Sequence, residues 1–172
     1  MVQRKGEPSL DRRSLIVHAA GMVEAESYRD PPGRVLARGV CRCLASLGFA
    51  PLLEYVPARG LRVDVMALGP KGEIWVVECK SSRADFRSDH KWQGYLSWCD
   101  RFFWAVDTEF PQDVLPEGTG LILGDGFGAE VLRLPEIDPL PAARRKALMQ
   151  DFGRQAALRL ARVKDPMLDT EF

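Results

Sequence analysis

Three apolar segments separated by two glycine-ended turns, between residues 50 and 79, constrain the fold of this chain more than any other feature. The three segments read APLLEYVP, GLRVDVMAL and EIWVVEC. The links between them are short, and short links join strands that are antiparallel neighbours. In the second turn, Pro70 suits the second position of a type I turn and Gly72 suits the left-handed position that completes a three-residue hairpin loop. The sequence therefore predicts an antiparallel meander of three strands.

The register set by this second turn brings charged residues together. A three-residue loop pairs Gly69 with Glu73, so that Asp64 lies directly opposite Glu78. Lys80 is two residues from Glu78 and therefore shares its face of the sheet. A shift of one residue would move the two acids to opposite faces, so the prediction depends on the register.

The first turn predicts a third acid in the same row. The segment PARGL (57–61) again offers three loop residues ending in glycine, and pairing its two ends places Glu54 opposite Asp64. We therefore expect Glu54, Asp64 and Glu78 to form one row across three strands, with Lys80 beside it.

Three neighbouring carboxylates repel one another strongly in a medium of low dielectric constant. A divalent cation compensates them, and oxygen ligands at a partly open site suit Mg²⁺ or Mn²⁺ better than Zn²⁺. Such an ion holds a phosphate and lowers the pKa of a bound water, while Lys80 orients that water or neutralises charge on the phosphate. The alternative is a structural ion-pair network, in which Lys80 pairs with Glu78 or Arg62 pairs with Asp64.

The remaining apolar patterns predict helices and strands around this meander. A helix over 34–47 precedes it, and RFFWAV (101–106) is apolar throughout, as is typical of a buried strand. A helix that begins at Asp89 and ends near Trp98 serves as the crossover to that strand. Two short strands and a last helix follow, at 120–123, 129–134 and 141–163. We expect an α/β fold with a mixed sheet and helices on both faces.

The last helix carries an apolar stripe and several arginines. The stripe consists of Met149, Phe152, Ala156, Leu160 and Val163. The arginines lie mostly off the stripe and are interpreted as a solvated face: Arg144, Arg145, Arg154, Arg159 and Arg162.

Composition narrows the class of protein. Lys+Arg and Asp+Glu are equal at 24 each, so any contact with nucleic acid must come from a local basic patch. The 4 cysteines form no C-x-x-C pair, which favours reduced thiols in a cytoplasmic protein over a zinc site. No apolar run is long enough for a membrane span. Residues 1–30 are interpreted as an N-terminal extension, whose short apolar run predicts a helix or arm rather than a signal peptide.

Two motifs resemble a known superfamily. Asp64, thirteen intervening residues and Glu78-Cys79-Lys80 resemble the PD-(D/E)XK nuclease core, whose elements follow the order α-β-β-β-α-β. The string ECKSSRADFRSDHKWQGYLSWCDRFFWAV is similar to the MmcB-type bacterial DNA-repair proteins, as are LARGV and RRKALMQDFGRQAALRL. The likeness extends from about Arg34 to Leu160.

The resemblance implies a restriction-endonuclease-like fold and metal-dependent cleavage of DNA phosphodiesters in repair. By motif, Asp64 and Glu78 would bind Mg²⁺ or Mn²⁺, and Lys80 would be the catalytic lysine. DNA is the implied partner, and a homodimer would suit an enzyme that acts on two strands.

The chain departs from the superfamily pattern at two places. Many relatives have Gln-x-x-x-Tyr on the following helix, where this chain has Lys91 and Tyr95, four residues apart on one face of the expected helix. A phosphate contact would suit the lysine. Many members also place an acid on the first helix, which has none here, and Glu54 is the predicted replacement.

The segment RADFRSD, directly after the motif strand, leaves alternatives open. Asp85 either reaches the edge of the metal site or organises the turn by accepting backbone N–H bonds. Arg83 and Arg87 either contact DNA phosphates or pair with Asp85 and Asp89.

Three other functions compete with a DNA endonuclease. The first is a non-catalytic DNA-binding module on a nuclease fold. The second is an RNA or tRNA nuclease, because nothing in the sequence reads the 2′-hydroxyl. The third is a protein-interaction domain, which suits the zero net charge but leaves the row of acids unexplained.

Overall fold

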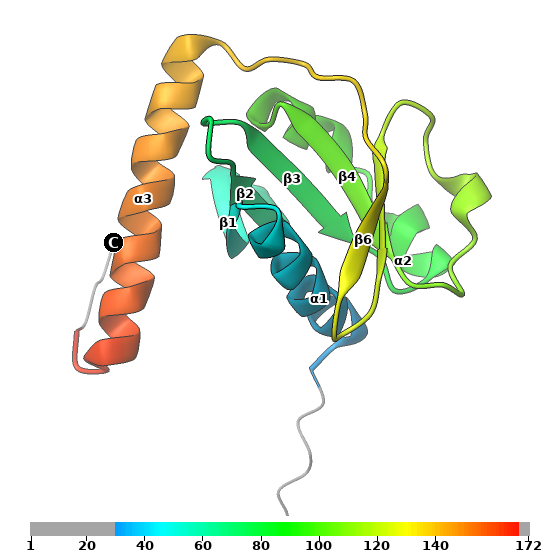
Figure 1. Ribbon diagram of the computed structural model, residues 1–172, viewed down its shortest axis with the longest axis horizontal. Helices are drawn as coiled ribbons and strands as arrows, with labels where there is room; N and C mark the ends of the chain where they lie inside the picture. Colours follow the sequence, from blue (N-terminus) through cyan, green and yellow to red (C-terminus); the bar gives the residue numbers. More distant parts are fainter. Residues whose placement is uncertain (1–29, 169–172) are drawn as a thin grey trace, which may run out of the picture. The chain divides into compact units, whose positions relative to one another are not determined.

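A computed structural model describes residues 30–168, which fold around a six-stranded mixed sheet (Figure 1). The strands lie in chain order: β1 (Ala50–Ala58), β2 (Leu61–Leu68), β3 (Ile74–Cys79), β4 (Arg101–Val106), β5 (Gly120–Gly124) and β6 (Ala129–Arg133). β1, β2 and β3 form the predicted antiparallel meander, β4 and β5 run parallel to β3, and β6 is antiparallel to β5.

Helices cover both faces of this sheet. α1 (Pro32–Ser46) lies across one face, where Val40 and Leu44 pack against alternate residues of β2, β3 and β4 (Figure 1). The crossover from β3 to β4 and α3 (Ala142–Lys164) pack on the other face. The helix, meander, crossover and parallel strand follow in the predicted order, so the α/β, restriction-endonuclease-like fold is confirmed. None of the helices in residues 30–168 combines the length and apolar character that a membrane crossing requires.

The turn between β2 and β3 has the predicted register. Gly69 donates its N–H to the carbonyl of Glu73 at 2.8 Å, and Gly72 has a φ of 83°, which suits glycine. Pairing then runs from Leu68 with Ile74 to Val65 with Val77. The next pair in this register is Asp64 with Glu78.

The turn between β1 and β2 was predicted incorrectly, although the register beyond it is right. Ala58, not Pro57, faces Leu61, and a bulge between Tyr55 and Ala58 takes up the extra residue. Tyr55 therefore faces Val63 and Leu53 faces Val65, which leaves Glu54 opposite Asp64. Glu54 itself has a φ of 47°, a left-handed conformation that is uncommon for a residue with a side chain.

The crossover differs from the single helix expected at 89–98. It contains α2 (Arg83–Ser88), which the sequence analysis treated as a turn, and the 3-10 helix η1 (Trp92–Trp98). Ser82 caps α2, because its hydroxyl accepts the N–H of Asp85 at 3.1 Å. A 3-10 helix has about three residues per turn, so positions four apart do not share a face. Accordingly Lys91 is exposed while Tyr95 is buried.

α3 is attached by a narrower stripe than the sequence predicted. Leu148 and Phe152 are buried in the core, whereas Leu160 is 56% exposed and Val163 is 80% exposed. The interpretation of its arginines as a solvated face is wrong for Arg145, which donates two hydrogen bonds of 2.6 Å to a buried carboxylate.

That carboxylate belongs to Asp100, the residue directly before β4. It also accepts the backbone N–H groups of Ile74 and Leu140, at 2.7 and 2.8 Å. Arg144 and Arg159 likewise donate to backbone carbonyls, those of Ser97 and of Leu53 and Glu54. Arginines of α3 thus tie this helix to the sheet.

Candidate active site

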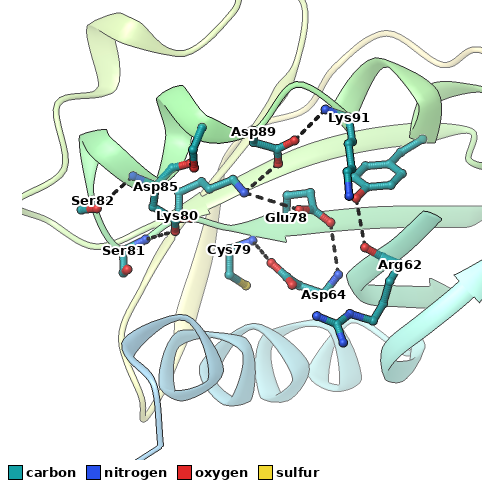
Figure 2. Close-up of polar contacts among 12 residues, drawn as sticks. Arg62, Asp64, Glu78, Cys79, Lys80, Ser81, Ser82, Asp85, Asp89 and Lys91 are labelled. Carbon is teal, nitrogen blue, oxygen red and sulfur yellow. Dashed lines mark hydrogen bonds and ion pairs between the residues drawn. The ribbon is translucent and has the colours of Figure 1, made fainter. Parts of the chain in front are cut away.

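Two carboxylates lie where the backbone pairing of β2 with β3 ends. Beyond Val65 and Val77, the N–H of Cys79 donates to Asp64 Oδ2 at 2.8 Å, and the N–H of Asp64 donates to Glu78 Oε1 at 3.2 Å (Figure 2). Buried backbone N–H groups need acceptors, and here carboxylates take the place of ladder carbonyls. Each acid is therefore fixed by the backbone of the opposite strand.

Lys80 stands beside these acids and is itself buried. Its Nζ is 2.7 Å from Asp89 Oδ2 and 3.6 Å from Glu78 Oε2 (Figure 2). The backbone N–H of Lys80 bonds the carbonyl of Ala105 at 2.8 Å, which extends the pairing of β3 with β4 past the end of β3. The lysine is thus directed from the end of the inner strand β3 toward two carboxylates.

Aromatic side chains form an apolar wall behind the charged groups. Trp104 of β4 is the register partner of Glu78, and the Lys80 Nζ lies 5.7 Å from the centroid of its ring. Phe86 of α2 and Trp92 of η1 pack edge-on against Trp104, with centroids 5.1 and 5.7 Å away. This packing keeps water from one side of the site and lowers its local dielectric constant.

Burial and mutual repulsion disturb both acids. Burial, and then the charge of Asp64, raise the pKa of Glu78 from its ordinary 4.5 to about 8, although Lys80 opposes the rise. Burial also raises the pKa of Asp64, against the opposing effects of the Cys79 N–H and of Lys80. At neutral pH the pair of acids therefore retains a proton unless a cation compensates it.

The lysine and its partner are shifted in the opposite sense. Burial alone would lower the pKa of Lys80, but its bond to Asp89 and the charge of Glu78 raise it. Burial alone would raise the pKa of Asp89, but the bonds from Lys80 and from the Lys91 N–H lower it. Lys80 is consequently a stable ammonium group and Asp89 a stable carboxylate.

Glu54 does not join the row of acids expected from the sequence. Its carboxylate accepts a 2.9 Å bond from Arg34 of α1 and lies 3.6 Å from Arg62 of β2. Within residues 30–168 no group of three or more His, Cys, Asp or Glu side chains is arranged to hold a metal ion. The left-handed backbone at Glu54 explains why its register position did not fix the direction of its side chain.

The other candidates lie around the rim. Asp85 organises the start of α2, since its carboxylate accepts the N–H of Ser81 at 3.4 Å. Arg83 and Arg87 are exposed on α2 and form no ion pair with any residue in the described range 30–168. Tyr95 donates its hydroxyl to the carbonyl of Arg62 at 3.0 Å, two residues before Asp64.

Asp89 is the residue that sequence reasoning missed. From the sequence, Asp89 is predicted only as a helix cap or as a partner for arginines. In part it behaves as expected, because its Oδ1 accepts the N–H of Lys91 at 2.9 Å. The available signal was Lys80 itself, since a lysine at the end of a buried strand needs an acidic partner.

Comparison with known proteins places the chain in a family. A sequence model of the MmcB-like DNA repair proteins matches residues 25–167. The chain belongs to the MmcB-like DNA repair protein family. A solved structure of a protein of unknown function from Silicibacter pomeroyi is 58% identical to this MmcB-like chain and superimposes with a TM-score of 0.80. That match covers 83% of this chain and 98% of the other.

Other comparisons add little about the site of this MmcB-like protein. A repair endonuclease from Pyrococcus abyssi is 21% identical, over 51% of this chain and 42% of its own, with a TM-score of 0.35. That likeness is too slight to bear on function. Among curated proteins none matches.

The residues present fit a hard divalent cation such as Mg²⁺. This ion is commonly held by one or two carboxylates, together with substrate phosphate and water. Asp64 and Glu78 supply two carboxylates, and burial is the main cause that raises the pKa of each, with the charge of Asp64 as the second cause for Glu78. Asp64 Oδ1 accepts no hydrogen bond within residues 30–168. Two acids, rather than the expected three, are the proposed ligands.

Proposed function

We propose that this MmcB-like protein is a metal-dependent endonuclease that hydrolyses phosphodiester bonds of DNA during repair. The observation that carries the proposal is the arrangement of Asp64 and Glu78, each fixed by the backbone of the opposite strand, with a buried Lys80 next to them. Membership of a DNA repair family supports DNA as the substrate.

The three side chains have separate tasks in this mechanism. Asp64 and Glu78 would hold Mg²⁺ or Mn²⁺, each with the carboxylate oxygen that accepts no backbone hydrogen bond. The other oxygen of each, which accepts the N–H of Cys79 or of Asp64, would keep the carboxylate in place. When bound, such an ion supplies Lewis-acid activation of water and of the phosphate. Lys80 carries a fixed positive charge that stabilises the negative charge developing on the phosphate.

Exposed cations near the site would bind the DNA backbone. Arg62 precedes Asp64 by two residues, and its side chain is 68% exposed. Arg83 and Arg87 on α2 and Lys91 before η1 are exposed as well. These groups form the local basic patch that a chain of zero net charge requires. For cleavage of both strands of a duplex, we propose a homodimer.

The test is a cleavage assay with purified protein, Mg²⁺ or Mn²⁺, and branched, single-stranded, duplex and damaged DNA beside matched RNA. We expect metal-dependent cutting that Glu78→Gln and Lys80→Ala abolish. Glu73→Gln is the matched control, because it removes a carboxylate from the opposite end of the same hairpin. Undiminished cutting by Glu78→Gln would rule out the mechanism. Faster cutting of RNA than of DNA would show that RNA is the substrate.

A non-catalytic DNA-binding module is the second candidate, and one observation favours it. Lys80 is already neutralised by Asp89 and Glu78, so the charges of the site compensate one another in part without a metal ion. Calorimetric titration with Mg²⁺ separates the two functions. No heat of metal binding, together with salt-dependent DNA binding, would support the module.

A further inference from the structure

Asp89 forms the closest contact of the buried lysine. The side chains of Lys80 and Asp89 are only 7% and 11% exposed, and the 2.7 Å between them is shorter than the 3.6 Å from Lys80 to Glu78. The charges of an ion pair withdrawn from water are little screened by solvent, and removal of one partner leaves the other charge buried and uncompensated.

The fold holds Asp89 itself in place. The N–H of Asp89 bonds the carbonyl of Phe86 at 3.2 Å, which ends α2, and its Oδ1 accepts the N–H of Lys91 at 2.9 Å. Only Oδ2 therefore faces Lys80 (Figure 2). Because backbone groups on both sides fix Asp89, the ammonium group has one defined position.

This position keeps the lysine from closing on the proposed metal ligand. Without Asp89, the nearest remaining negative charge to the Lys80 ammonium would be Glu78, on the same strand two residues away. A Lys80–Glu78 contact closer than the present 3.6 Å would occupy a carboxylate oxygen that a cation needs. Asp89, at 2.7 Å, thus limits how closely the ammonium group approaches Glu78, which lies at 3.6 Å.

We propose that Asp89 is the positioning residue of Lys80, keeping its ammonium group from approaching Glu78 more closely and directing it to the reacting phosphate. This inference rests on the proposed nuclease function and extends it. Asp89 touches neither substrate nor metal in this role, and it acts only through Lys80.

The test compares Asp89→Asn with the wild type in two measurements. Asparagine keeps the shape of the side chain and can still accept the Lys91 N–H, so it removes chiefly the charge. The first measurement is the rate of reductive methylation of each lysine, followed by mass spectrometry, with the exposed Lys71 and Lys91 as internal references. The second is single-turnover DNA cleavage, which separates the rate of the chemical step from DNA affinity.

Asp107→Asn is the matched control. The carboxylate of Asp107 also accepts the N–H of the residue two positions later, at 3.0 Å from Glu109, but it forms no ion pair with any residue in 30–168. Loss of a local turn contact alone would therefore affect both variants equally. Asp89→Glu, which restores the charge, completes the set.

We expect the methylation of Lys80 to rise several-fold in Asp89→Asn, while Lys71 and Lys91 do not change. The cleavage rate should fall by about tenfold to a hundredfold, as for removal of other supporting contacts at active sites, with DNA affinity within twofold. Asp89→Glu should recover part of the rate, and Asp107→Asn should behave as the wild type.

Two results would overturn the inference. One is unchanged methylation of Lys80 in a folded Asp89→Asn protein, and the other is an unchanged cleavage rate. A wild type that cuts no nucleic acid with either metal contradicts the proposed function, and with it the part of the inference that Asp89 directs Lys80 to the phosphate. Even then, the methylation result decides independently whether Asp89 holds Lys80.

Discussion

Replacing Glu78 by glutamine should stabilise the protein when no metal is present. Glu78 is 4% exposed, and its pKa rises from 4.5 to about 8 because of burial and the charge of Asp64. The folded state therefore binds a proton more tightly than the unfolded state, and stability falls as pH rises between these two values. Glutamine is never charged and keeps an oxygen for the N–H of Asp64.

The size of the effect follows from the two pKa values. Each pKa unit corresponds to about 1.4 kcal/mol, so the cost of ionising Glu78 is below about 1 kcal/mol at pH 5. It reaches about 3 kcal/mol at pH 7 and about 5 kcal/mol above pH 8. The increase in the free energy of unfolding caused by Glu78→Gln should rise with pH in the same way.

Urea unfolding in the presence of a chelator, at pH 5, 7 and 8.5, measures this difference. Glu73→Gln reports any general effect of removing a carboxylate from the hairpin. Adding Mg²⁺ should reverse the order, because an ion that binds only the folded wild type stabilises it selectively. Two results would refute the reasoning. One is a Glu78→Gln protein less stable than the wild type at pH 8.5 without metal, and the other is a difference in the free energy of unfolding that does not change with pH.

Three further outcomes are expected. Arg145→Ala should lower the free energy of unfolding by about 3 kcal/mol in urea, because it leaves the buried Asp100 carboxylate without its cation. Unchanged stability would contradict this role. Glu54→Gln should release Arg62 and strengthen DNA binding at low salt by about twofold to fivefold, with a steeper salt dependence in fluorescence anisotropy. Weaker binding would argue that Glu54 positions the arginine. Val163→Lys should change the free energy of unfolding in urea by less than about 0.5 kcal/mol, because the Val163 side chain is exposed rather than packed.

Much of the fold follows from local sequence. Alternating apolar segments with short links specify the meander, and the chemistry of Pro70 and Gly72 fixes the turn that sets Asp64 against Glu78. The Asp-x13-Glu-x-Lys spacing then indicates the kind of site. These features depend on neighbours along the chain and on hydrogen bonding across one hairpin, so they can be derived from residue order alone.

Tertiary structure decided which charges meet. The left-handed backbone at Glu54 kept its register but let its carboxylate meet Arg34 and Arg62, and Asp89 at the end of α2, rather than Asp85, pairs with Lys80. Several acids were equally plausible partners in the sequence. The choice among them depends on distances between separate elements, and no local rule specifies these because burial selects the pairs that the packed chain can neutralise.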